Sequence, residues 1–230
     1  MEIHGFQKMT LLDYPGKVAC TVFTGGCNMR CPFCHNAFLV TELSRSEHFS
    51  QQEILELIAS RKKLLDGVAV TGGEPLLTED TLDFLARLKN LGLAVKLDTN
   101  GSFPDRLQRA VREGLVDYVA MDIKNAPQAY AATAGVPGLA LEPIRESVRF
   151  LLSGAVDYEF RTTIVAEYHS LEDMEAIGRW IQGARRYYLQ SFVDSGNLIR
   201  QGLHGVNRAS MLALRDTARK YISCVEIRGI

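Results

Sequence analysis

Three cysteines stand close together in the chain: Cys27, Cys31 and Cys34. Thiolates are soft ligands that bind iron–sulfur clusters and zinc. Three of them at this spacing suit an oxygen-sensitive [4Fe–4S] cube that keeps one iron open to a substrate. The alternative is a structural zinc ion with His35 as the fourth ligand, but zinc sites favour a second cysteine or histidine pair, and none is present. The spacing therefore favours the cluster.

The other two cysteines, Cys20 and Cys224, are single residues in predicted strands, and we expect both to be core thiols. An odd total of five cysteines does not suit a secreted disulfide framework. The first residues lack the basic and apolar regions of a signal peptide, and no run of about 18 apolar residues is present to span a membrane. We therefore expect a cytoplasmic protein.

A second group of residues with chemical potential is Gly72-Gly73-Glu74-Pro75. Two glycines allow the backbone to approach a ligand closely, and the carboxylate of Glu74 could bind an ammonium group. Taken alone, the segment is more typical of a plain turn with a solvated acid.

Charged residues form the third group. Asp98 and Asp122 end two apolar segments, and unpaired buried carboxylates at such places need a cation or a hydrogen-bond donor. Lys124 could pair with them or meet a substrate carboxylate, and Arg161 could contact a ligand or a structural ion-pair partner. Helix capping by Asp98 and a surface ion pair for Asp122 are the alternatives. An amino-acid ligand, with an amine and a carboxylate, would satisfy all three groups.

These groups follow predicted strands. Six short apolar segments alternate with helical patterns: Lys17–Thr24, Gly67–Thr71, Leu93–Asp98, Val116–Asp122, Asp157–Val165 and Arg185–Phe192. The alternation predicts right-handed βαβ units and a parallel sheet, as a doubly wound sheet or an incomplete (β/α)6 barrel. In barrels the chemistry lies in the loops after the carboxyl ends of the strands, which is where these groups fall.

Capping residues mark where the predicted helices begin. Two pairs have the capping-box spacing, Ser50 with Glu53 and Ser170 with Asp173. Further predicted helix starts are Thr78, Ser102 and Asn207. The segment Cys224–Arg228 is predicted to be a final strand.

Length and charge bound the function further. A chain of 230 residues suits a single domain over residues 1–230. The net charge is -1, from 26 basic and 27 acidic residues, so no long-range attraction to nucleic acid or to an anionic membrane is expected.

The cysteine motif, with the aromatic Phe33 before its last cysteine, resembles the signature of the radical S-adenosylmethionine (SAM) superfamily. The Gly-Gly-Glu-Pro segment resembles that superfamily's second motif, which holds the methionine amine. The resemblance extends from Cys27 to Arg161. It implies an incomplete (β/α)6 TIM-like barrel, a [4Fe–4S] cluster on the three cysteines, and SAM as the second cofactor.

A narrower resemblance is to the activating proteins of glycyl radical enzymes. It is carried by Cys34-His35-Asn36, Asp98-Thr99-Asn100-Gly101 and Asp122-x-Lys124. The opening FQKMTLLDYPGKVACTVFTGGCNMRCPFCHN is most similar to activating proteins of anaerobic ribonucleoside-triphosphate reductase. That similarity implies reductive cleavage of SAM, and a 5′-deoxyadenosyl radical that generates a glycyl radical on a partner enzyme. A reduced flavodoxin- or ferredoxin-like protein would donate the electron.

The resemblance also assigns residues to the cofactors. The residues expected to contact SAM are Phe33, Asn36, Gly72, Gly73, Glu74, Asp98, Lys124 and Arg161. Those expected to help hold a monovalent cation beside the methionine carboxylate are Asp98, Thr99 and Asp122. The loops 125–138 and 194–205 are candidates for contact with the partner.

Three alternatives remain open on the sequence. The first is an activator of another glycyl radical enzyme, of the pyruvate formate-lyase type. The second is a small-molecule radical SAM enzyme such as 7-carboxy-7-deazaguanine synthase, although that family tends to place Asp-Thr where this chain has His35-Asn36. The third is a zinc-stabilised binding module.

Overall fold

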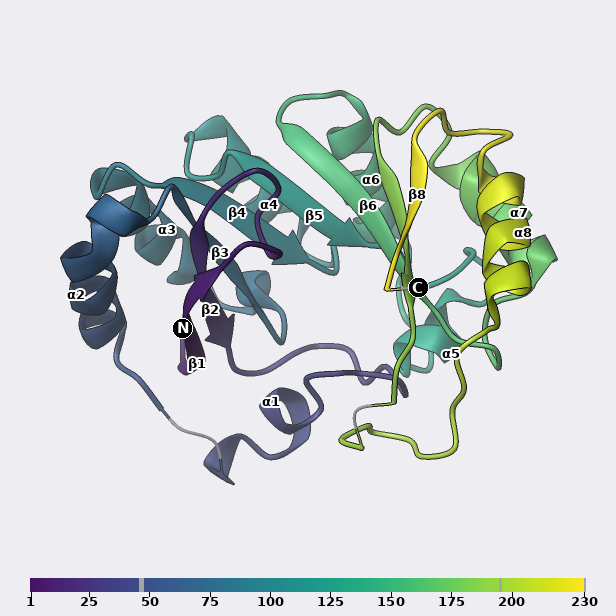
Figure 1. Ribbon diagram of the computed structural model, residues 1–230, viewed down its shortest axis with the longest axis horizontal. Helices are drawn as coiled ribbons and strands as arrows, with labels where there is room; N and C mark the ends of the chain where they lie inside the picture. Colours follow the sequence, from purple (N-terminus) through teal and green to yellow (C-terminus); the bar gives the residue numbers. More distant parts are fainter. Residues whose placement is uncertain (46–47, 195, 230) are drawn as a thin grey trace. The chain divides into compact units, whose positions relative to one another are not determined.

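The computed structural model describes residues 1–45, 48–194 and 196–229 (Figure 1). The chain divides into two compact units. The first unit comprises Met1–Asn28 and Phe38–Ala120, and the second comprises Met29–Ala37 and Met121–Ile230. Each unit therefore contains part of the cysteine motif.

The first unit is built on a sheet. Its strands are β1 (Ile3–Thr10), β2 (Ala19–Thr24), β3 (Gly67–Gly72), β4 (Ala94–Thr99) and the start of β5 (Tyr118–Asp122). β1 runs antiparallel to β2, whereas β2, β3 and β4 are parallel. Most residues of β2 and β3 are buried, as expected of parallel strands that are covered on both faces.

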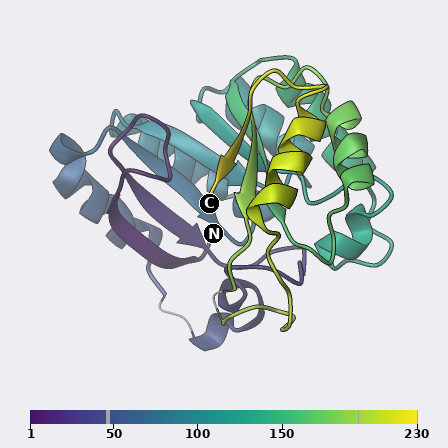
Figure 2. The same ribbon diagram turned by 45° about the vertical axis from the view of Figure 1, so that its right-hand side comes forward.

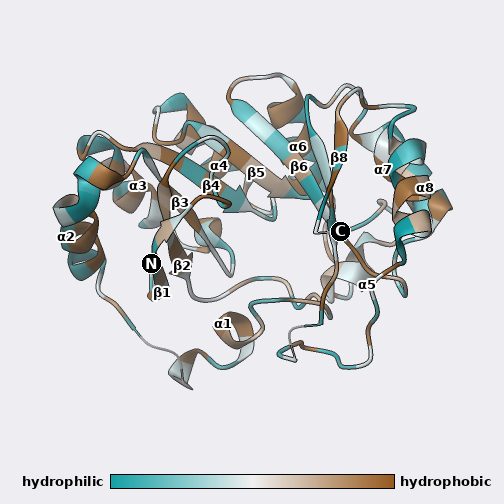
Figure 3. Cartoon of the chain, viewed as in Figure 1, coloured by the Kyte–Doolittle hydropathy of each residue, from teal (hydrophilic) through white to brown (hydrophobic). Residues whose placement is uncertain are grey.

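The helices of the first unit follow its strands. They are α1 (Phe38–Thr41), α2 (Gln51–Arg61), α3 (Thr81–Asn90) and α4 (Pro104–Arg112), with 3-10 turns η1 (Leu43–Arg45), η2 (Lys62–Leu64) and η3 (Pro75–Leu77). Figure 3 shows both hydrophobic and hydrophilic colour along α2, as expected of an amphipathic helix that packs with one face only. Its buried residues are Ile54, Leu55 and Ile58.

The second unit contains three parallel strands: β6 (Asp157–Ile164), β7 (Tyr187–Ser191) and β8 (Val225–Arg228). Its helices are α5 (Tyr130–Ala134), α6 (Glu142–Leu152), α7 (Leu171–Trp180) and α8 (Arg208–Ala218). Helices α7 and α8 lie side by side in Figures 1 and 2, and each buries a methionine, Met174 and Met211, in the core.

The strands pair in the order of the sequence, from β1 to β8. This order confirms the predicted α/β fold and is consistent with an incomplete TIM-like barrel. All six predicted segments contain a strand, and the predicted final strand is β8. The prediction was wrong in omitting β1, because Gln7, Lys8 and Met9 are exposed on this antiparallel strand and break the apolar pattern that marks buried strands.

Both predicted capping boxes are present. The Glu53 backbone N–H donates to Ser50 Oγ over 3.1 Å, and Ser50 N–H donates back to Glu53 Oε2 over 2.8 Å. Asp173 makes the same pair of bonds with Ser170, at 3.1 and 3.0 Å. Asn207 caps α8 through Ser210 N–H.

Two predicted helix starts were wrong. α3 begins at Thr81 rather than after Thr78, because Thr78 ends the turn η3. α4 begins at Pro104 rather than after Ser102, because proline is favoured at the first position of a helix and Phe103 then stands at the N-cap. Among the described residues, no helix is long and apolar enough to cross a membrane.

The end of α5 supports the segment that carries two of the cysteines. Gly135 adopts a left-handed conformation, with φ of 67°, and Arg30 N–H donates to Ala134 O over 2.9 Å. A Cβ atom at Gly135 would lie 2.0 Å from Arg30 O, which is closer than atoms can approach. Gly138 has a similar φ of 72°, but a Cβ atom there would meet nothing within 4 Å.

These two glycines make a matched pair for a stability test. We expect Gly138→Ala to cost about 1–2 kcal/mol, the ordinary penalty of a side chain in the left-handed region. Gly135→Ala adds a clash between backbone segments, so we expect a loss on the order of 4 kcal/mol, near the upper end for point mutations. Urea denaturation under anaerobic conditions measures both. Equal losses of stability in the two variants would contradict the conclusion that the end of α5 supports the backbone of Arg30.

Candidate active site

The three cysteines of the motif are divided between the two units. Cys27 belongs to the first unit, and Cys31 and Cys34 belong to the second. None of the three forms a disulfide; Cys31 is buried and the other two are partly exposed. Within residues 1–45, 48–194 and 196–229, no three His, Cys, Asp or Glu side chains form a group ready to hold a metal ion. Each unit therefore contains one half of the candidate site.

In the first unit, the Gly-Gly pair brings the loop after β3 against the loop after β2. Gly73 N–H donates to Thr24 O over 2.9 Å, and Glu74 N–H donates to Gly26 O over 2.8 Å. A Cβ atom at Gly73 would lie 1.8 Å from Gly26 O, and one at Gly72 would lie 2.3 Å from the Thr24 nitrogen. Glycine is required here because two backbone segments meet with no space for a side chain.

The carboxylate of Glu74 joins the loop after β3 to the loop after β4. Its side chain is only 1% exposed, which rules out the solvated acid of a plain turn. Oε1 accepts hydrogen bonds from Leu76 N–H at 3.0 Å and Thr99 Oγ1 at 2.8 Å. Oε2 accepts a hydrogen bond from Asn100 N–H at 2.6 Å. These bonds satisfy the charge of a buried carboxylate. The binding of a methionine amine by Glu74 stays a prediction.

The loop after β4 returns to the cysteine motif through Asn100. Its side-chain amide lies 3.8 Å from Cys27 Sγ and donates to Asn28 Oδ1 over 2.9 Å. In the sequence Asn100 is part of the Asp98-Thr99-Asn100-Gly101 motif, which by itself predicts no role for this residue. The signal that could have found it is its place directly after a strand, in the loop that in barrels carries the chemistry.

The two acids expected to hold a cation occur in different surroundings. Asp98 forms an ion pair with Lys96, which is buried in the same strand. Thr99 donates its hydroxyl hydrogen to Glu74. Asp122 belongs to the second unit and pairs with residues of that unit. The shared monovalent cation stays a prediction.

In the second unit, Asp122 is held between two cations. Lys124 Nζ lies 3.0 Å from Asp122 Oδ2, and Arg161 Nε lies 2.9 Å from Oδ1. Burial raises the pKa of Asp122, but the charges of Arg161 and Lys124 outweigh this effect and lower it to about 2. Burial lowers the pKa of Lys124, and the Asp122 carboxylate more than reverses the effect, so Lys124 remains charged.

The charge of Lys124 also acts on the two cysteines of this unit. Burial raises the pKa of Cys31 and of Cys34, while Lys124 opposes that rise at both thiols. Buried thiols are therefore neutral until a metal replaces their protons, and a nearby cation lowers the cost of forming the thiolates. This donor set fits an iron–sulfur cluster, which is bound by cysteine thiolates.

Phe33 lies between Cys31 and Cys34 in the sequence, and it is buried in the structure. Its ring centroid lies 5.9 Å from that of Tyr168 and 6.4 Å from that of His169. His169 Nε2 lies 2.9 Å from Lys124 O, so the same histidine contacts the backbone that carries Lys124. Sequence analysis missed both aromatic residues, because nothing in their local pattern distinguishes them from the loop before α7.

Asn36 and His35 follow the last cysteine of the motif. The Asn36 backbone forms a hydrogen bond with the Cys34 thiol, which lowers that thiol's pKa against the effect of burial. His35 is exposed, and its ring centroid lies 5.7 Å from that of Phe192. Cys20 is fully buried, as predicted, and burial raises its pKa to about 12; Cys224 is partly exposed, so its assignment to the core was wrong.

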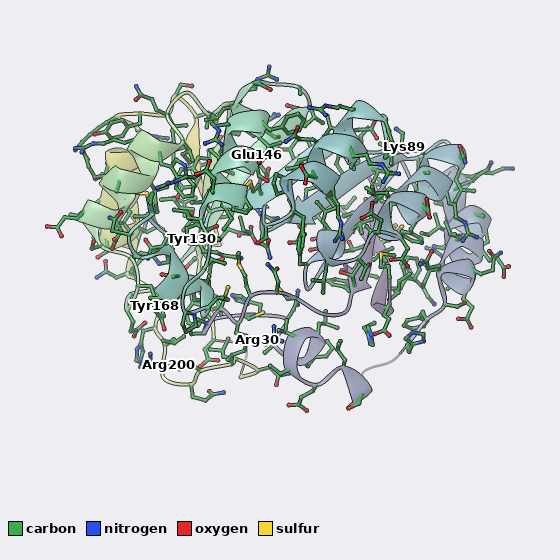
Figure 4. All side chains as sticks on the ribbon, turned by 180° about the vertical axis from the view of Figure 1, so that it is seen from behind. Arg30, Lys89, Tyr130, Glu146, Tyr168 and Arg200 are labelled. Atoms are coloured by element: carbon green, nitrogen blue, oxygen red, sulfur yellow. The ribbon has the colours of Figure 1, made fainter. Side chains whose placement is uncertain are left out.

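Two loops hold the backbone of residues 30–32. Arg200 N–H donates to Pro32 O over 2.9 Å, and its guanidinium lies 3.4 Å from Tyr168 Oη. From the other loop, Ala134 O accepts the Arg30 N–H. Figure 4 shows Arg30, Tyr168 and Arg200 gathered in one part of this unit. The predicted partner-contact loops 125–138 and 194–205 thus support the cysteine segment; residue 195 lies outside the described residues.

The pairing of Asp122 predicts a pH-dependent stability. Its lowered pKa contributes stability that is complete above the ordinary carboxyl pKa and is lost as the pH falls from about 4 to 2. We expect Asp122→Asn to cost about 2 kcal/mol at pH 7, and the difference from wild type to disappear across that window. Denaturation of both proteins at several pH values measures it.

Asp216→Asn is the control, because Asp216 is in an exposed pair with Arg215 and should change stability by less than about 1 kcal/mol. A wild-type-like stability of Asp122→Asn at neutral pH would show that the two cations do not depend on this carboxylate.

Comparison with known proteins identifies the family. Residues 21–181 match the model of the radical SAM superfamily. A Methanocaldococcus jannaschii protein, named provisionally as a glycyl-radical enzyme activating enzyme, is 31% identical over 99% of this chain and 96% of its own length. The pyruvate formate-lyase-activating enzyme of Clostridium pasteurianum is 31% identical over 54% of this chain and 52% of its own length. The 7-carboxy-7-deazaguanine synthase of Hyperthermus butylicus is 39% identical over 40% of this chain and 38% of its own length.

Solved structures agree in fold. SuiB of Streptococcus suis superposes with a TM-score of 0.71 at 12% identity, over 91% of this chain and 48% of that protein. Its structure bound to S-adenosylmethionine gives a TM-score of 0.69. These results confirm the resemblance predicted from the cysteine and Gly-Gly-Glu motifs. The chain therefore belongs to the radical SAM superfamily, and it is an enzyme whose cofactors are a [4Fe–4S] cluster and S-adenosylmethionine.

Proposed function

We propose that this protein is an activating enzyme that generates a glycyl radical on a partner enzyme, specifically an anaerobic ribonucleoside-triphosphate reductase. The observation that carries the activating role is the extent of the similarity. The match to the glycyl-radical enzyme activating enzyme covers 99% of this chain, whereas two matches to deazaguanine synthases cover 40% and 59%. Similarity along the whole chain includes the elements around the site, not only the shared cofactor motifs.

In this proposal Cys27, Cys31 and Cys34 would hold the cluster. When bound, the cluster and SAM together supply a 5′-deoxyadenosyl radical that removes a hydrogen atom from a backbone glycine of the partner. The protein's own contribution is to hold and orient the cofactors. The residues that would bind SAM are Phe33, Asn36, Gly72, Gly73, Glu74, Asp98, Lys124 and Arg161.

The charges of the second unit suit that role. Asp122 pairs with both Lys124 and Arg161 and so offsets their mutual repulsion, while the charge of Lys124 acts on Cys31 and Cys34. The pair could then meet the methionine carboxylate of SAM. A monovalent cation held by Asp98, Thr99 and Asp122 would add to that charge.

The choice of the reductase rests on the opening segment of the chain and on the Cys-His-Asn and Asp-Thr-Asn-Gly motifs. A reduced flavodoxin- or ferredoxin-like protein would supply the electron. Few basic residues stand near the loops in sequence, so a nucleoside triphosphate is not favoured as the direct substrate. A polypeptide loop of the partner is the favoured substrate.

The cluster assignment predicts about four irons per chain after anaerobic reconstitution, since a cube has four metal corners. Alanine at Cys27, Cys31 or Cys34 should abolish SAM cleavage, because each removes a ligand. Cys224→Ala is the control and should keep both iron and cleavage. Iron analysis and detection of 5′-deoxyadenosine measure the outcome. Stoichiometric zinc, or a full cluster in the triple variant, would contradict the assignment.

The activating role predicts a glycyl radical on the partner. The reduced protein, SAM and an anaerobic ribonucleotide reductase are mixed without oxygen, and electron paramagnetic resonance should show a doublet. Deuterium on the target glycine should appear in 5′-deoxyadenosine. A pyruvate formate-lyase in place of the reductase tests the other activator class. Deuterium that arrives only from a free metabolite would instead support a small-molecule enzyme.

A further inference from the structure

Asn100 lies in the first unit, and its side chain reaches a thiol of the cysteine motif. Its Nδ2 atom lies 3.8 Å from Cys27 Sγ, within the range of an N–H···S hydrogen bond. The residue follows β4 directly, and its side chain is only 5% exposed. The donor is therefore shielded from water although Cys27 is partly exposed, and a hydrogen bond to a charged sulfur is stronger there than in open solvent.

The neighbours of Asn100 determine which way its amide faces. Ser102 N–H can only donate, and it lies 2.9 Å from Oδ1, so this atom must be the oxygen. The amide nitrogen then faces Cys27 and Asn28, with Asn28 Oδ1 accepting one of its hydrogens at 2.9 Å. The second hydrogen is available to Cys27 Sγ.

The backbone of Asn100 is held as firmly as its side chain. Its N–H donates to Glu74 Oε2 over 2.6 Å, and Glu74 N–H in turn donates to Gly26 O, next to Cys27. The donor and the sulfur are thus connected through one buried carboxylate. This arrangement holds the amide at the sulfur.

We propose that Asn100 is a positioning residue that sets the reduction potential of the cluster through its hydrogen bond to Cys27 Sγ. Reduction adds negative charge to a cluster and to its thiolate ligands. A hydrogen-bond donor at a ligand sulfur stabilises the reduced form more than the oxidised form, and so raises the potential. Asn100 makes the cluster easier to reduce by the electron donor. The inference rests on Cys27 being a cluster ligand, as in the proposed function, and is independent of the partner's identity.

The test compares the midpoint potential of the reconstituted cluster among variants. Asn100→Ala removes the donor together with the acceptor for Ser102 N–H. Asn100→Asp keeps an oxygen for Ser102 N–H and removes the donor, and the negative charge that it adds acts in the same direction. We expect both variants to shift the midpoint to a more negative value in redox titrations followed by electron paramagnetic resonance.

Ser102→Ala is the matched control, because it alters the same loop and keeps the backbone N–H. Ser102 Oγ is buried with no hydrogen-bond partner in the part of the chain that the structure describes, so its removal should leave the midpoint unchanged. Equal midpoints in wild type, Asn100→Ala and Asn100→Asp, at equal iron content, would overturn the inference. An equal shift in Ser102→Ala would also overturn it, since the effect would then belong to the loop.

A second measurement does not depend on the variants folding. Wild-type protein is labelled with ¹⁵N at the side-chain amide of asparagine, and the hyperfine coupling of that nitrogen to the reduced cluster is recorded. We expect a coupling in the wild type, and Asn28→Ala should retain it, because that change removes the acceptor and the labelled amide of Asn28 but leaves the amide of Asn100. No amide coupling in a fully loaded wild-type protein would overturn the inference. A wild-type protein that binds no cluster would instead contradict the proposed function.

Discussion

The buried carboxylate of Glu74 is the interaction on which the first half of the site depends. It accepts hydrogen bonds from Leu76, Thr99 and Asn100, while its backbone binds the loop that carries Cys27. A charge at this depth is tolerated only because every one of these donors is supplied by the protein. The loops after β2, β3 and β4 are consequently held together as one assembly, and a change in one of them is transmitted to the others.

In the second half of the site, charged side chains rather than backbone N–H groups stabilise a carboxylate. Asp122 lies between Lys124 and Arg161, and the end of α5 and the loop around residue 200 hold the backbone beside Cys31. Each half therefore has its own anion, buried in the case of Glu74 and partly exposed in the case of Asp122, and its own support for the cysteine motif. The surroundings of the three ligands therefore differ. The Cys27 thiol receives an amide hydrogen bond, whereas the charge of Lys124 acts on the thiols of Cys31 and Cys34.

Much of the fold could be predicted because local signals were strong. The strands that are buried on both faces have continuous apolar sequences, and the capping boxes at Ser50 and Ser170 require residues only three positions apart. The prediction failed where a distant partner decides the outcome. Strand β1 is stabilised by pairing with β2 despite its exposed residues, which break the apolar pattern of a buried strand.

The sequence by itself determined the chemistry of this protein: three thiols at iron–sulfur spacing, a Gly-Gly-Glu segment and the family to which they belong. It could do so because ligand types and short spacings are written in consecutive residues. Only the tertiary structure decided what individual side chains do. The bond from Asn100 to Cys27 spans 73 positions, that from Thr99 to Glu74 spans 25, and that from Arg161 to Asp122 spans 39. Hydrogen bonds and ion pairs between such distant residues leave no local pattern, because folding alone brings their partners within reach.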